Sequence, residues 1–124
     1  YYNKNYKKCF SIIEEICCNL PCEICRLHAV QKMKNTTDNM INTKEKLINY
    51  LFNFHNDVSQ RIGKQIYDKS ILAKYKSFIP LKGFIHFRKC FFKPYYSLNF
   101  NQWKRDMLLR KLNKELLEMW FQIF

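Results

Sequence analysis

Turn-forming residues are scarce in this sequence, which holds only two glycines and three prolines among 124 residues. A sandwich or barrel of many short strands needs a turn signal about every 8–12 residues, so we exclude such folds. Hydrophobic residues make up 48% of the chain and aromatic residues 17%, whereas disordered chains lack aromatics. We therefore expect one folded all-α domain, a small bundle of a few long helices.

Long apolar runs are also missing. No run approaches the roughly 18 residues of a membrane-spanning helix, so we expect no membrane span. The chain begins with Tyr1 rather than with methionine, and we expect its native start to lie further upstream. The lack of a leader peptide in this sequence therefore carries no conclusion.

Acidic residues are few, 10 against 22 basic ones, which gives a net charge of +12. Such a charge suits an acidic partner, such as nucleic acid, an anionic membrane surface or an acidic protein. A coding bias towards Lys, Asn, Ile and Tyr explains it equally well, and lysine outnumbers arginine, which specific phosphate clamps favour. Nucleic-acid binding is therefore only an alternative. It would use Lys82, Arg88, Lys89, Lys93, Lys104, Arg105, Arg110 and Lys111.

Apolar spacing predicts four helical segments. The first covers about residues 5–18, and the second runs from Pro21 to about Lys34 and is followed by a polar loop at 35–39. The third carries apolar residues from Leu47 to Ile62, with a capping-box pattern at Asn42 and a stop at Gly63. The last starts near residue 99 or 101. A shorter helix at 64–77 fits the pattern too, and residues 80–98 fit either a loop or a short strand.

The pair Cys22–Cys25 is the most informative of six cysteines at positions 9, 17, 18, 22, 25 and 90. Side chains three residues apart share one face of a helix. Pro21 suits a helix start, which places Cys22 where unpaired N–H groups lower the pKa of a thiol. Cys22 and Cys25 therefore have the pattern of an exchange-active pair.

Other interpretations of this CxxC pattern remain. A thioredoxin-like site needs a βαβ frame, and haem attachment needs histidine where Arg26 stands. Structural zinc is the serious rival, because Cys17 or Cys18 could complete a ligand set with Cys22, Cys25 and His28. The CxxC alone does not decide between a zinc-bound interaction module and a redox pair.

Two motifs resemble one known family. The segment from Phe54 to Lys64 reads FHNDVSQRIGK and is similar to the HNxVNxxLGK signature of the Erv/ALR sulfhydryl oxidases. It lies thirty residues after the CxxC, as in that family. The segment 20–29, LPCEICRLHA, resembles the family's YPCxxCxxH, most closely in the versions of large DNA viruses. Together the resemblance covers about residues 5–70.

The resemblance implies a helical bundle that binds FAD, with Cys25 against the flavin and Cys22 exchanging with the substrate. Electrons would pass from protein dithiols through the Cys22–Cys25 disulfide to flavin and oxygen, giving hydrogen peroxide. It also implies a homodimer, with the Leu47–Ile62 stripe in its interface. The viral likeness implies the cytoplasm of an infected host cell or the virion.

The resemblance implies cofactor contacts at positions that match the family's motifs, and no metal. Ser59 replaces an asparagine of the signature, and Tyr50 stands where the family has a stacking tryptophan. The expected cofactor-binding residues are His28, Tyr50, His55, Asn56, Val58, Ser59, Ile62, Lys64, Lys93 and Phe100.

The resemblance also divides the chain. We expect residues 1–79 to form the oxidase core and residues 80–124 to form an extension that packs on the same domain. The family's first helix would lie upstream of residue 1.

Overall fold

The computed structural model describes residues 2–20, 22–77, 79–91 and 102–123. Its helices are α1 (Tyr2–Cys18), α2 (Glu23–Lys34), α3 (Asp38–Ile41), α4 (Lys44–Arg61), the 3₁₀ helix η1 (Lys69–Tyr75), α5 (Pro80–Phe91) and α6 (Gln102–Ile123). The described residues contain no strand, so the predicted all-α class is confirmed.

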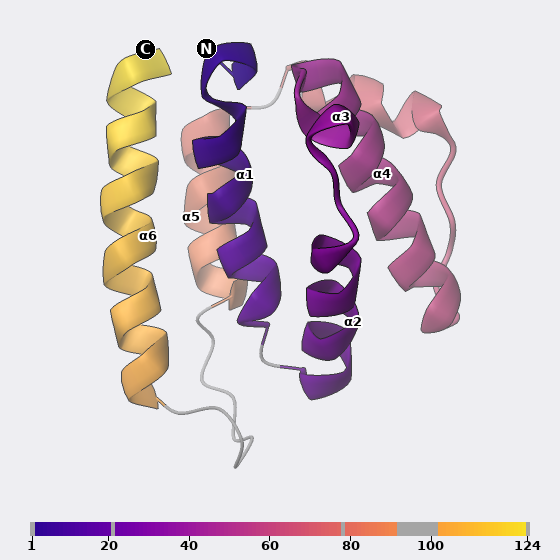
Figure 1. Ribbon diagram of the computed structural model, residues 1–124, viewed down its shortest axis with the longest axis horizontal. Coiled ribbons are helices and arrows are strands. Elements are labelled where there is room, and N and C mark those ends of the chain that lie inside the picture. Colours follow the sequence, from indigo (N-terminus) through magenta and orange to yellow (C-terminus); the bar gives the residue numbers. More distant parts are fainter. Residues whose placement is uncertain (1, 21, 78, 92–101, 124) are drawn as a thin grey trace.

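Helix α1 lies at the centre of the molecule. It stands between α6 and α2, with α5 behind it, while α4 and η1 lie beyond α2 (Figure 1). One face of α1 contributes Phe10 to a core shared with α2, α3 and α4, which contains Ala29, Met33, Ile41, Leu47, Tyr50 and Phe54. Its opposite face contributes Ile12 to a second cluster with Leu108 and Leu112 of α6. Burial on both sides of α1 joins the two halves of the bundle.

The two ends of α4 are capped as its sequence allows. Thr43 precedes the helix and its Oγ1 accepts a hydrogen bond from the Lys46 N–H at 3.3 Å. At the other end Gly63 has φ +69°, a conformation that costs glycine little, and Lys64 N–H donates to the Ser59 carbonyl at 2.8 Å. The predicted stop at Gly63 is confirmed, and the predicted cap at Asn42 is wrong by one residue.

Three local predictions are corrected. Asp38 and Asn39, expected in a loop, begin the short helix α3. Only Lys69–Tyr75 of the expected 64–77 helix is helical, as a 3₁₀ turn. Residues 80–91, left between loop and strand, form α5. Pro80 is the first residue of α5, where a missing N–H costs nothing, so it starts the helix rather than breaking it.

Much of the Leu47–Ile62 stripe is used inside the chain. Leu47 and Phe54 are buried, and Leu51 and Val58 pack against the same core, which leaves Ile62 exposed. The stripe therefore cannot also serve as the expected dimer interface without opening this core. Among the described residues no helix is both long enough and apolar enough to span a membrane.

Candidate functional site

Cys22 caps the N-terminus of α2. Its backbone is extended (φ −76°, ψ 117°), and its Sγ accepts a hydrogen bond from the Cys25 N–H at 3.4 Å. The Arg26 guanidinium donates to the Leu20 carbonyl at 3.1 Å, which fixes the chain that leads into the helix. Cys22 is exposed and Cys25 is half-buried. The pair therefore presents one accessible sulfur and one shielded sulfur.

The two thiols differ in acidity because of their positions. The Cys25 thiol and backbone N–H both donate to the Cys22 sulfur, which lowers the pKa of Cys22. The same contact with Cys22, together with partial burial, raises the pKa of Cys25. In the reduced pair Cys22 is thus the more acidic thiol and Cys25 the less acidic one. This is the arrangement of an exchange-active cysteine at a helix N-terminus.

The cysteines of α1 lack such stabilisation. Burial raises the pKa of Cys17 to about 11, and burial also raises the pKa of Cys9 and Cys18. The side chain of Cys90 lies outside the described residues. Of the five cysteines that the structure describes, Cys22 is the one whose pKa is lowered.

The ligand set for zinc is not assembled. The described residues include Cys17, Cys18, Cys22, Cys25 and His28, and they contain no group of three or more metal-ligating side chains that could hold an ion. This geometry does not support the zinc-bound module.

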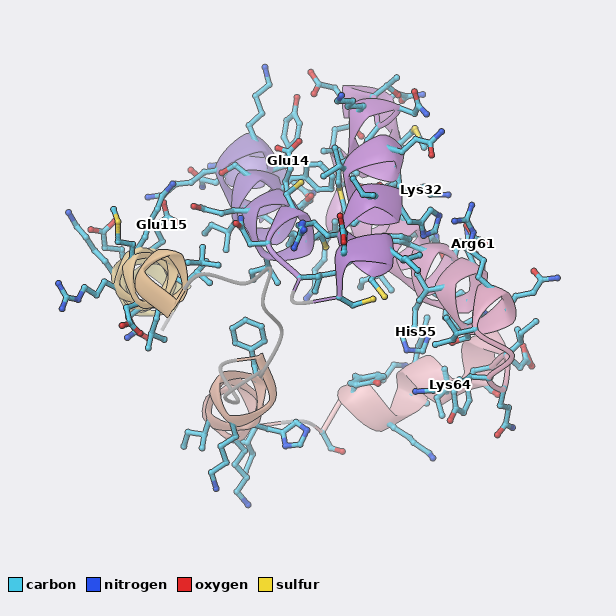
Figure 2. The ribbon with its side chains drawn as sticks, turned by 90° about the horizontal axis from the view of Figure 1, so that it is seen from below. Glu14, Lys32, His55, Arg61, Lys64 and Glu115 are labelled. Atoms are coloured by element: carbon cyan, nitrogen blue, oxygen red, sulfur yellow. The ribbon has the colours of Figure 1, made fainter. Side chains whose placement is uncertain are left out.

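His28 lies on the seam between α2 and α4. Its ring meets the edge of Phe54 with centroids 5.8 Å apart, and it lines a cavity of about 380 Å³. Partial burial, followed by the charges of Arg61 and Lys32, lowers the pKa of His28. An ion pair of 3.0 Å between Lys32 and Asp57 closes the same seam. Figure 2 shows Lys32 and Arg61 on this side of the molecule.

A larger groove lies on the other side of α4, where η1 folds back against the helix. It has a volume of about 960 Å³ and adjoins a cavity of about 410 Å³. His55 and Tyr67 line both, and their ring centroids are 6.4 Å apart. Figure 2 shows His55 and Lys64 on this side. The groove is lined by Lys44, Ile48, Leu51, Phe52, His55, Asn56, Tyr67, Ile71, Leu72, Lys74, Tyr75 and Lys76.

Asn56 lines this groove and holds Tyr67 against α4. Its side-chain amide donates to the Tyr67 carbonyl at 2.9 Å and accepts from the Tyr67 N–H at 3.1 Å. The two bonds tie the segment after α4 back onto the helix. Asn56 therefore positions Tyr67 and, through it, the wall that η1 supplies.

The residues expected at a cofactor fall into four groups. Six of them line the groove or the adjoining cavity: His55, Asn56, Val58, Ser59, Ile62 and Lys64. His28 lines the separate cavity across α4. Tyr50 lines none of these cavities, because it is buried in the core and its hydroxyl is 2.7 Å from Thr36 Oγ1. Lys93 and Phe100 lie outside the described residues.

Sequence reasoning missed the wall opposite α4. Tyr67 and Tyr75 face the groove from the far side together with Lys74 and Lys76. The available signal was two tyrosines eight positions apart in a lysine-rich segment that follows the signature.

The redox pair lies at the same end of α4 as the smaller cavity. Helices α2 and α4 run antiparallel (Figure 1). The Tyr50 hydroxyl lies 3.7 Å from Met33 Sδ, and Phe54 contacts His28. One further turn in this register brings Cys25 to the level of Val58 and Ser59, and both of these line the smaller cavity.

Comparison with known proteins adds one match. A protein-family model described as the Erv1 / Alr family matches residues 2–78, which is more than half of the chain and includes both the CxxC helix and the signature helix. The comparisons with curated proteins and with solved structures gave no match. The exchange-active pair, the groove beside the signature helix and this match agree, and the chain belongs to the Erv1 / Alr family.

Proposed function

We propose that this protein is a FAD-dependent thiol oxidase that makes disulfide bonds in other proteins through the Cys22–Cys25 pair. The family is one of FAD-linked sulfhydryl oxidases. The observation that carries the proposal is the asymmetric pair at the start of α2, with an exposed Cys22 of lowered pKa and a shielded Cys25 of raised pKa.

The groove between α4 and η1 has the chemistry that a flavin nucleotide needs. Aliphatic side chains, Phe52 and two tyrosines offer apolar surface for flat rings, and small-molecule sites of about 300–1,000 Å³ have this character. Lysines supply point charges for a pyrophosphate at both ends, Lys64 at one and Lys44, Lys74 and Lys76 at the other. The residues present therefore fit the cofactor, with His55, Val58, Ser59 and Ile62 beside it. When bound, FAD supplies a two-electron acceptor that restores the Cys22–Cys25 disulfide and is reoxidised by oxygen.

The two cysteines divide the exchange between them. A substrate thiolate attacks Cys22 Sγ of the disulfide, because this is the exposed sulfur, and the S–S bond breaks. Cys25 leaves with the electron pair and takes a proton, as its raised pKa allows. A second substrate thiolate then attacks the substrate sulfur of the mixed disulfide. Cys22 leaves as a thiolate, which the Cys25 N–H stabilises.

The decisive test combines a spectrum with one substitution. The purified protein, with FAD supplied, should show flavin absorption that bleaches with a dithiol and recovers in air. Cys25→Ser should retain the flavin and lose dithiol-dependent oxygen consumption. Cys18→Ala is the matched control, because Cys18 lies on α1 and burial raises its pKa, and it should turn over normally. A colourless protein, or normal turnover in Cys25→Ser, would contradict the proposal.

The assembly and the compartment are also part of the proposal, and the family resemblance alone supports them. We propose a homodimer in the cytoplasm of an infected host cell or in the virion. Light scattering of the purified protein should give twice the monomer mass, and a monomer at micromolar concentration would contradict the dimer. Because Leu47 and Phe54 are buried within the chain, a dimer interface must use another face.

A further inference from the structure

The short segment between α1 and α2 is anchored just before it reaches Cys22. Leu20 packs against both apolar clusters, the core shared by α1, α2, α3 and α4 and the cluster between α1 and α6. The Asn19 side-chain amide donates to the Glu15 carbonyl at 2.7 Å, which holds the same segment to the end of α1. Pro21 has no N–H to donate. Leu20 is therefore an anchored residue two positions before the exposed sulfur.

Arg26 connects this anchor to the first turn of α2. It lies one helical turn after Cys22, because its backbone N–H donates to the Cys22 carbonyl at 2.9 Å. Side chains on a helix lean towards its N-terminus. The half-buried Arg26 side chain follows this direction, and its guanidinium donates to the Leu20 carbonyl at 3.1 Å. Arg26 thus ties together the residues that precede and follow Cys22.

We propose that Arg26 is a positioning residue for the thiol exchange, which holds Cys22 at the start of α2 and keeps a positive charge beside its sulfur. The inference rests on the proposed function and adds to it a residue outside the disulfide pair. Arg26 forms and breaks no covalent bond, and it acts through Cys22.

The hydrogen bond to Leu20 matters because the disulfide must be formed again in every cycle. A Cys22–Cys25 disulfide requires Cα atoms about 4.4–6.8 Å apart. Each sulfur that is already held within reach of the other raises the effective concentration of the pair. Without the tie, the backbone at Cys22 gains freedom in the reduced state, and closing the disulfide must remove that freedom.

The charge of Arg26 acts on the same sulfur. Among the described residues no carboxylate forms an ion pair with Arg26, so its charge is not neutralised. The Cys25 thiol and N–H are the main cause of the lowered pKa of Cys22, followed by the Ile24 N–H and the Arg26 guanidinium. No charged group described on α1 or α4 contributes to this lowering. Removing the guanidinium should therefore raise the pKa of Cys22 while the effect of Cys25 remains.

The first test measures the charge. The full reduced chain is alkylated with iodoacetamide across a range of pH, and peptide mass mapping gives the rate at Cys22. Below the pKa of Cys22, Arg26→Gln should react about threefold more slowly, the effect in water of one charge a helical turn away. At alkaline pH, where Cys22 is fully deprotonated, the rates should be equal. Arg26→Lys keeps the charge and should match the unaltered chain throughout.

The second test measures the tie. Without oxygen, the full chain is equilibrated with reduced and oxidised glutathione, in which one oxidised glutathione takes two electrons and two protons from the pair and yields two reduced glutathiones. Arg26→Lys keeps the charge but lacks the long, planar guanidinium. Its equilibrium constant for forming the Cys22–Cys25 disulfide should fall about tenfold, the entropy of ordering one freed backbone residue.

Lys34→Gln is the matched control for both tests. Lys34 is an exposed cation on the same helix, twelve residues after Cys22 and so about 18 Å along the axis, beyond the screening length of physiological salt. It should change neither the alkylation profile nor the glutathione equilibrium.

An Arg26→Gln chain with the unaltered low-pH rate, or an Arg26→Lys chain with the unaltered glutathione equilibrium, would overturn the inference. A residue that only stabilised the fold would give both of these results while lowering the free energy of unfolding. If Arg26→Gln does not fold, Arg26→Lys still decides. Neither readout needs flavin or substrate protein, so a protein without oxidase activity would refute the proposed function and leave this test standing.

Discussion

At the scale of single residues, position on a helix separates two cysteines of the same motif. Cys22 lies outside the first turn of α2 and receives N–H donors, whereas Cys25 lies within it and is partly shielded. The charged form of Cys22 is therefore stabilised, and its departure from a mixed disulfide is easier. Partial burial, followed by the neighbouring Cys18, instead raises the pKa of Cys17.

This difference predicts an order of alkylation. Because the thiolate is the reactive form, iodoacetamide at pH 7.5 should modify reduced Cys22 first and Cys17 last. The Cys22 rate should fall with decreasing pH through the lowered pKa of Cys22, which lies below the ordinary value of 9. Cys17, with a pKa of about 11, should gain reactivity only in strong alkali. Peptide mass mapping after timed quenching measures both, and equal labelling of the two cysteines at pH 7.5 would contradict the assignment.

The lowered pKa of Cys22 also makes the free energy of unfolding depend on pH. Folded Cys22 holds its proton less tightly than the unfolded thiol. Its contribution to the free energy of unfolding is therefore fully present above the unfolded pKa of about 9. That contribution is lost as the pH falls through the folded pKa.

At the scale of elements, the ends of α4 show how far local pattern reaches. The Gly63 stop was predicted because only a left-handed residue ends a helix in this way, whereas the start was misplaced because Asn42 and Thr43 are both good caps. Only the backbone shows that Thr43 aligns with the Lys46 N–H. Asn42 instead accepts from the Lys46 ammonium at 3.0 Å in a partly buried contact.

The two caps can be distinguished by mutation. Thr43→Ala should lower the free energy of unfolding by about 1 kcal/mol, because an N–H at the start of α4 loses its acceptor. Asn42→Ala should change it by less than about 0.5 kcal/mol, since the Lys46 ammonium keeps Asn39 as an acceptor and Thr43 still caps α4. Urea denaturation of both variants measures this. A larger loss in Asn42→Ala would restore the cap expected from sequence.

The sequence predicted only one wall of the groove beside α4, the wall formed by α4 itself. His55, Ser59 and Ile62 share a stripe that spacing reveals, and all three line the smaller cavity. The opposite wall depends on Asn56 reaching Tyr67, eleven residues later, through two hydrogen bonds that no periodicity encodes. Tyr50 shows the opposite error. It occupies a motif position expected at the cofactor, but its ring packs against Phe10 in the core.

At the scale of the whole molecule, α1 joins the family part of the chain to the helices that follow it. The family model ends at residue 78, and α5 and α6 come after it. Besides the apolar cluster of Ile12, Leu108 and Leu112, the Lys111 ammonium lies 2.9 Å from a Glu15 carboxylate oxygen of α1. Exposed ion pairs contribute little, so the apolar cluster must supply most of the attachment.

Leu112 is the residue on which this attachment depends, with 1% of its surface exposed. Leu112→Ala should lower the free energy of unfolding by about 2–5 kcal/mol, whereas Met107→Ala, at an exposed position of the same helix, should have little effect. Because α1 packs in both clusters, the loss should reach the α1–α2 core as well. Urea unfolding can be followed by tryptophan fluorescence, which reports α6, and by Cys17 reactivity, which reports α1. The urea midpoints from the two probes should therefore shift together. If fluorescence shifted while Cys17 protection did not, α6 would be an independent unit and residues 80–124 would not share the oxidase core's fold.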